Sequence, residues 1–314
     1  MAAAPKYRKL SATIFLDLRR KPSRLPPPVA VEMTMLYNFK YLTINRFSQG
    51  LEDEFQGAFG KVEPAYGNFV NWIGRLALEN IANSDMLYHD MEHTMLVTTV
   101  GQQILLGRHL TDGGISPREW AHCITALLCH DIGYVRGVCR LDGKGVCATG
   151  IGNATVTLDP EGTDAQLTPF HVDRSKLFIR ERFGNNPLID IDPEMVCEFI
   201  EMTRFPVPVG DPAYQVTDNF AGLVRAADFI GQLGDPDYLR KIPALFFEFE
   251  QLGTNTKIGY KSPTDMRRGF ATFFWKEVSP YIQQATRYLQ ATQDGNQWLA
   301  NLHSHVFQVE HAEH

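Results

Sequence analysis

The chain of 314 residues is long enough to bury a sizeable hydrophobic core within one large domain. Hydrophobic residues make up 44% and charged residues 21%, a balance that argues against global disorder, a coiled coil or a collagen-like fibre. The formal net charge of −6 gives the chain no electrostatic basis for wrapping a nucleic acid polymer. A small-molecule substrate is therefore favoured.

Positive charge is concentrated at the N-terminus, where residues 1–24 hold seven basic side chains and one acid. Three prolines follow, and we interpret residues 1–30 as a basic, Pro-ended extension that is solvated, with contact to an anionic membrane or a targeting role as alternatives. Its apolar run, Ala12–Leu16, is too short for a signal peptide or a membrane span. No later segment is long enough either, so we expect no transmembrane segment.

The cysteines indicate a reducing compartment. There are five, an odd number, and no two form a CxxC pair. Neither a disulfide scaffold nor a thiolate zinc site is indicated, so we expect a cytoplasmic protein. The sequence leaves the oligomeric state open.

Helical periodicity begins after a lead-in, residues 31–64, and continues through residues 65–314. Apolar residues recur there at spacings of three and four, which predicts an all-α bundle of amphipathic helices. Two stripes matter most, the first formed by Val97, Val100 and Ile104 and the second by Trp120, Ile124 and Leu127. Ser116 as cap, Pro117 and Glu119 form a start signal for the helix that carries the second stripe.

The pattern changes between residues 134 and 170. Alternation in Ala154–Leu158, among Gly, Asp and Thr residues, predicts a small β-hairpin insertion there. We expect the next helix to begin at Thr168, with Pro169 in its first position, and we expect Gly133 to mark a helix end.

Three separate segments carry residue types that bind metals. His89 and His93 are four apart, which predicts that they share one helical face, and His93 continues the first apolar stripe. His130 and Asp131 close the second stripe, and Asp228 lies on the apolar face of a later predicted helix. Imidazoles and carboxylates from three helices are thus directed toward the same interior.

Buried carboxylates need a neutralising partner, because an unpaired buried charge costs several kcal/mol or more. Two imidazoles and two carboxylates suit one or two divalent ions such as zinc, manganese, magnesium or iron. The alternative is that Asp228 pairs with an arginine such as Arg225 while the histidines are ordinary core residues. The zinc-protease pattern HExxH is not matched, because Asp90 follows the first histidine.

The order of these motifs resembles the HD superfamily of metal-dependent phosphohydrolases, which are all-helical. The segment Tyr88–His93 is similar to the YHNxxH signature of the class I 3′,5′-cyclic nucleotide phosphodiesterases, and Ala226–Asp228 resembles the helix that brings their last ligand. The resemblance covers roughly residues 65 to 285.

The resemblance implies a site and a reaction. Its metal ligands match His93, His130, Asp131 and Asp228, and the aspartate of the pair, Asp131, bridges two ions. It implies hydrolysis of a phosphodiester such as a cyclic nucleotide, with a metal-bound hydroxide as the nucleophile.

His89 matches the general acid of that family, which donates a proton to the leaving oxygen. Asp90 or Glu92 is expected to hold its ring in place.

The chain departs from the family signature at several positions. Leu96 replaces an aspartate, and Ile132–Tyr134 replaces a segment with an acid and a histidine. Arg267 stands where those enzymes place a base-reading glutamine, and Phe270 matches the phenylalanine that stacks on a purine.

Four further residues are candidates for contacts with substrate or a second metal. His171 follows the insertion and resembles the extra histidines of dinuclear HD proteins, and Arg174, Lys176 and Arg204 are candidate phosphate contacts. An HD hydrolase of another nucleotide phosphate, a non-catalytic HD module, and an HD-type di-iron oxygenase resembling inositol oxygenase remain alternatives. The oxygenase would need a second extra histidine, and residues 172–227 contain none.

Overall fold

The computed structural model describes residues 39–184 and 190–312. The basic extension, residues 1–30, and the start of the lead-in lie outside these ranges. The chain divides into two units, residues 1–43 and 44–314, and the description below concerns the second.

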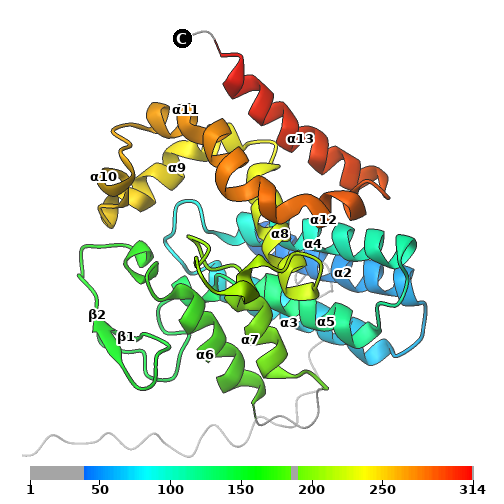
Figure 1. Ribbon diagram of the computed structural model, residues 1–314. Coiled ribbons are helices and arrows are strands. Elements are labelled where there is room, and N and C mark those ends of the chain that lie inside the picture. Colours follow the sequence, from blue (N-terminus) through cyan, green and yellow to red (C-terminus); the bar gives the residue numbers. More distant parts are fainter. Residues whose placement is uncertain (1–38, 185–189, 313–314) are drawn as a thin grey trace, which may run out of the picture. The chain divides into compact units, whose positions relative to one another are not determined.

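The α-helices of the described residues are α2 (Phe39–Phe59), α3 (Pro64–Ile81), α4 (Met91–Thr111), α5 (Pro117–Cys129), α6 (His171–Phe183), α7 (Pro193–Glu201), α8 (Phe220–Leu233), α9 (Tyr238–Gln251), α10 (Thr254–Ile258), α11 (Pro263–Phe273), α12 (Ser279–Leu289) and α13 (Gln293–Glu310) (Figure 1). Short 3₁₀ helices are η2 (Ile132–Tyr134), η3 (Asp164–Leu167) and η4 (Pro212–Gln215), and a π-helical turn, η5 (Phe274–Val278), joins α11 to α12. The all-α fold expected from the periodicity is confirmed.

The most extensive helix pairing is between α4 and α8, and α12 packs against both (Figure 1). Gly231 makes this pairing close, because a Cβ on it would lie 2.6 Å from the Cα of Val97. α5 packs against α3, α4 and α7. The two predicted apolar stripes are buried in these contacts. Helices α4, α5 and α8 therefore converge on one interior.

The start of α5 follows the predicted capping pattern. The Ser116 hydroxyl accepts a hydrogen bond from the backbone N–H of Glu119, whose carboxylate accepts one from the N–H of Ser116. This reciprocal pair satisfies two backbone donors that the helix itself leaves unpaired. It therefore fixes the residue at which α5 begins.

The predicted hairpin is present between η2 and α6. Strands β1 (Val146–Ala148) and β2 (Thr155–Thr157) are antiparallel, with Cys147 opposite Val156. The insertion has its own small apolar cluster, separate from the main core and formed by Met86, Tyr134, Cys147, Leu158, Ala165 and Leu167.

Two predicted boundaries near the insertion are wrong. α6 begins at His171 rather than Thr168, and the Thr168 hydroxyl donates to the carbonyl of Ala165, so it does not cap α6. Gly133 does not end a helix, because α5 ends at Cys129 and Gly133 lies within η2. Its lack of a side chain serves a close approach, since a Cβ there would lie 1.9 Å from the carbonyl oxygen of His171.

The five cysteines are free thiols, as expected from their number and spacing, and the structure buries all five. In the parts of the chain that the structure describes, no helix is both long enough and apolar enough to cross a bilayer.

Candidate metal centre

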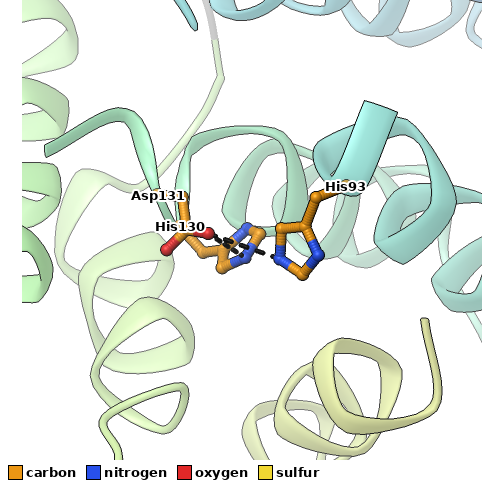
Figure 2. A group of neighbouring side chains, drawn as sticks. All are labelled: His93, His130 and Asp131. Carbon is orange, nitrogen blue, oxygen red and sulfur yellow. Dashed lines mark ion pairs between the residues drawn. The ribbon is translucent and has the colours of Figure 1, made fainter. Parts of the chain in front are cut away.

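Helices α4 and α5 bring His93, His130 and Asp131 together in the interior (Figure 2). His93 lies in the first turn of α4, His130 is the C-cap residue of α5, and Asp131 follows it. Oδ2 of Asp131 lies 3.1 Å from Nε2 of His130 and 3.4 Å from Nε2 of His93. All three side chains are at most 5% exposed.

Asp228 on α8 completes the group. Its Oδ1 lies 3.5 Å from Nε2 of His130 and 3.6 Å from Nε2 of His93. The two imidazoles therefore stand between two carboxylates. The structure thus brings together the four residues that the sequence singled out as a ligand set.

Several polar atoms of this group have no hydrogen-bond partner. Both ring nitrogens of His93, Nε2 of His130 and Oδ2 of Asp131 are buried and unpaired. Buried polar atoms are nearly always hydrogen-bonded, and a concentration of exceptions at one point needs a cause. Nε2 of His93 and Nε2 of His130 lie close to Oδ2 of Asp131, but neither nitrogen has the geometry of a hydrogen bond to that oxygen. A shared cation between them fits this arrangement.

The two carboxylates carry charge at neutral pH. Burial alone would raise the pKa of Asp131, but the adjacent imidazoles of His130 and His93 hold it well below its usual value. The same opposing effects lower the pKa of Asp228 to about 2. Both side chains are therefore in the form that binds a metal ion.

Backbone carbonyls orient two of the imidazoles. Nδ1 of His130 lies 2.7 Å from the carbonyl oxygen of Leu127, and Nδ1 of His171 lies 2.6 Å from that of Thr168. A carbonyl can only accept, so Nδ1 carries a proton in each ring, and Nε2 is the nitrogen that would bind a metal ion once the ring is neutral.

His171 lies next to the other oxygen of Asp131, with its Nε2 3.8 Å from Oδ1. Burial lowers the pKa of His171, which favours the neutral ring that a metal needs. Asp131 thus faces His93 and His130 through Oδ2 and His171 through Oδ1.

His89 lies beside the centre but not on α4. The helix begins at Met91, and Asp90 is its N-cap residue, whose Oδ1 accepts from the N–H of His93 at 3.0 Å. The prediction that His89 and His93 share a helical face is therefore wrong. Their ring centroids are nevertheless 5.3 Å apart.

Glu248 on α9 holds His89, in place of the predicted Asp90 or Glu92. Its Oε2 lies 2.6 Å from Nδ1 of His89, and its Oε1 accepts from the backbone N–H groups of Tyr88 and His89 at 2.6 and 3.2 Å. Burial alone would lower the pKa of His89, but the Glu248 carboxylate raises it to about 9. Glu92 instead pairs with Lys241 at 3.0 Å.

The sequence reasoning missed Glu248. One signal was present: it is a single acid within the aromatic run Phe246–Phe249, and a carboxylate buried there needs a partner. Nothing in the run indicates which partner.

The alternative to a metal centre was an ion pair between Asp228 and Arg225. Arg225 does not form that pair. The guanidinium is buried, and it donates to the carbonyls of Tyr214 and Val216 at 2.7 and 3.2 Å.

Arg174 was wrongly predicted to contact phosphate. It is fully buried and donates to Asp142 and to the carbonyls of Gly133, Val135 and Ala148. These bonds use the whole guanidinium to join α6 to the insertion, so none of its donors is left for a substrate.

Lys176 and Arg204 were also predicted as phosphate contacts. Both form ion pairs with Glu201 and Asp173, and Arg204 lies 3.0 Å from Asp173. Their charges are paired in a network between α6 and the end of α7.

The predicted base-binding pair on α11 is not supported either. Phe270 is 2% exposed and packs against the ring of Tyr238, with centroids 5.1 Å apart, so its face is not open to a base. Arg267 is exposed on the same helix, and no contact joins it to the centre within the described residues.

Two imidazoles and two ionised carboxylates form a mixed nitrogen and oxygen donor set. Zinc, manganese, iron and magnesium can be held by such donors at the junction of several helices. His89 lies next to this set and its ring is hydrogen-bonded to a carboxylate, the arrangement of an imidazole that transfers protons. The geometry can therefore support metal-assisted chemistry with proton transfer.

Among curated proteins, none matches the sequence significantly. Residues 37–312, which include every residue of the centre, match the family described as Npun_R2479-like. That description names no reaction and no ligand. Because the match covers most of the sequence, the chain belongs to the Npun_R2479-like family.

Proposed function

We propose that this chain is a metal-dependent phosphohydrolase that cleaves a phosphodiester, such as a 3′,5′-cyclic nucleotide. The observation that supports this most is the convergence of His93, His130, Asp131 and Asp228 on one point, with buried ligand atoms that have no hydrogen-bond partner. These four residues would hold one divalent ion. Asp131 Oδ1 and His171 offer donors for a second.

A divalent ion bound there lowers the pKa of a coordinated water and offsets negative charge on the phosphoryl oxygens. The residues around it supply proton transfer. In the protonated His89, Nδ1–H donates to Glu248, and Nε2–H is free to donate to the leaving oxygen. A water oxygen bonds to phosphorus, the bond from phosphorus to the leaving oxygen breaks, and that oxygen takes the proton of His89. The proton released by the water restores His89 by the end of the cycle.

The three cationic side chains predicted to contact phosphate add no free positive charge to this site. Arg174, Lys176 and Arg204 have their charges satisfied elsewhere, so the centre itself must neutralise the phosphate. A phosphodiester carries a single negative charge and demands less neutralisation than a triphosphate does. This favours the diester over the other nucleotide phosphates.

The test combines metal content with turnover. The protein, purified without chelators, is analysed for metals and assayed against cyclic and linear nucleotides and generic phosphodiesters with several divalent ions. Asp131→Asn should lose both metal and turnover, whereas His89→Asn should keep metal and lose turnover by roughly 10²- to 10⁴-fold. Asp112→Asn, which removes a carboxylate paired with Arg287, is the matched control.

Full turnover by Asp131→Asn, or wild-type protein without bound metal after incubation with each ion, would refute the proposal. Metal binding with no turnover on any substrate would favour a non-catalytic module.

The position of His171 beside Asp131 favours a second candidate, an HD-type di-iron oxygenase. Two irons per chain and turnover that depends on dioxygen would establish it in place of hydrolysis.

A further inference from the structure

Tyr134 lies between two imidazoles of the candidate centre. Its ring stacks on His171, with centroids 4.4 Å apart and planes inclined by 8°. It also stacks on His89, with centroids 5.3 Å apart and planes inclined by 28°. The three rings form one continuous stack, in which the outer two belong to the proposed acid and to the histidine beside Asp131.

The surroundings hold the Tyr134 ring in place. The side chain is 3% exposed and belongs to the small apolar cluster of the insertion, together with Met86 from the segment that leads to His89. The carbonyl of Thr168 accepts from the ring of His171. Packing therefore holds the ring of Tyr134, and a hydrogen bond holds the ring of His171.

The backbone adds a second constraint. The Ser175 hydroxyl donates to the carbonyl of His130 at 2.6 Å and accepts from the N–H of Gly133 at 2.9 Å. These bonds fix the start of α6 against the segment that carries Asp131. The stack consequently forms between α6 and the segment that carries Asp131, which these bonds hold together.

His89 needs such a contact because its hydrogen bond to Glu248 does not fix the plane of its ring. One hydrogen bond at Nδ1 fixes a point, and the ring can still tilt about it. A ring packed against its face sets the plane and so the direction of Nε2. Catalytic groups lose much of their effect when they are misplaced by about 1 Å.

We propose that Tyr134 is a positioning residue, whose ring holds the imidazoles of His89 and His171 at the orientation that the reaction requires. Through it, the hairpin insertion sets the geometry of the centre. The kinetic part of this proposal rests on the proposed hydrolase function. Its structural part does not.

The experiment compares Tyr134→Phe, which keeps the ring, with Tyr134→Met, which fills similar space without a flat face. Tyr288→Met is the matched control, since Tyr288 is a buried tyrosine that bonds to Asp112 and lies outside the stack.

Each protein is assayed for metal content and for kcat and KM on the best substrate. Tyr134→Met should lower kcat by roughly 10- to 100-fold with metal content retained and KM changed by less than about 3-fold. Tyr134→Phe should retain at least about a third of wild-type kcat.

A second readout needs no substrate. Diethyl pyrocarbonate modifies accessible imidazoles, and peptide mass spectrometry gives the rate at each histidine. His89 and His171 should react several-fold faster in Tyr134→Met than in wild type or in Tyr134→Phe, while the buried His122 and His305 stay unreactive. This result would stand even if no phosphate ester were hydrolysed, so it separates failure of this inference from failure of the proposed function.

Wild-type kcat and wild-type modification rates in Tyr134→Met would overturn the inference, as would a loss in Tyr134→Phe equal to that in Tyr134→Met. If His122 and His305 also become reactive in Tyr134→Met, that variant has lost the fold. Tyr134→His then replaces it as the test variant. That variant keeps a flat ring and should retain slow modification of His89. Fast modification there would count against the proposal.

Discussion

Oε2 of Glu248 lies 2.6 Å from Nδ1 of His89, although 159 residues separate the two in the sequence. The same carboxylate accepts two backbone N–H groups from the turn that carries His89. It therefore holds the turn and anchors Nδ1 of the ring. Burial by itself would raise the pKa of Glu248, but His89 and these N–H groups lower it, so the carboxylate is ionised.

Glu248→Gln should keep the shape of this contact but lose its charge. We expect bound metal to remain, because Glu248 is not among the four converging residues, and kcat to fall by roughly 10- to 100-fold, because the ring of His89 loses the charge that favours its protonated form. Elemental analysis and steady-state kinetics measure the two effects. Glu250→Gln on the same helix is the control. Equal loss of metal and turnover would show that Glu248 supports the centre rather than the acid.

Arg174→Lys should act on stability. The guanidinium is buried and bonds to three carbonyls and to Asp142, and a lysine cannot reproduce its five directed donors. Lysine keeps the charge opposite Asp142 but leaves buried carbonyls without a donor, and each costs about 1 to 3 kcal/mol, so the free energy of unfolding in urea should fall by that order or more. Arg240→Lys, at an 82% exposed side chain, should change little. A rise in KM with unchanged stability would restore the phosphate-binding role.

His122 should make stability depend on pH. Its Nε2 accepts the N–H of Asp192 at 2.8 Å, so the native state needs the neutral ring, and burial and the charge of Arg118 lower its pKa below 6.5. The unfolded chain therefore binds the proton more readily, and stability should fall as pH drops through about 6.5 and level off below the native pKa. Urea unfolding at pH 5 to 8 measures this. His122→Gln should show a smaller loss between pH 7 and pH 5, and an identical pH dependence would contradict the assignment.

Gly133→Ala should separate α6 from the candidate centre. The added Cβ would meet the carbonyl oxygen of His171 at 1.9 Å, and this neighbour is backbone on a packed helix. We expect destabilisation of about 1 to 3 kcal/mol or more, measured by thermal or urea unfolding. Gly50→Ala, in the interior of α2 with open space around it, should instead stabilise by up to about 1 kcal/mol. Equal stability of the two alanine variants would contradict the close approach.

Periodicity was sufficient to predict the fold class and the convergence of side chains. His93 and His130 extend apolar stripes that had to face the core, so their burial in the same interior followed from helix geometry. The hairpin followed from alternation in Ala154–Leu158, which is typical of a strand.

Long-range partners could not be predicted. Glu248 is near His89 only because α9 returns to the start of α4, and Arg174 is buried only because the carbonyls of the insertion surround it. The start of α6 was misplaced because Thr168 has the sequence of a helix cap but bonds to the preceding 3₁₀ turn. Tertiary contacts decided the first two cases, and a local hydrogen bond decided the third.

The hairpin insertion begins at Tyr134 and ends just before His171, and these two rings lie face to face. The segment therefore departs from the helical scaffold and rejoins it at nearly the same place. Its length is thereby uncoupled from the spacing of the surrounding helices, in the way that a loop with adjacent ends tolerates added or deleted residues. Provided that both rings and the groups that bind Arg174 are kept, the hairpin can be lengthened or shortened without rebuilding the bundle.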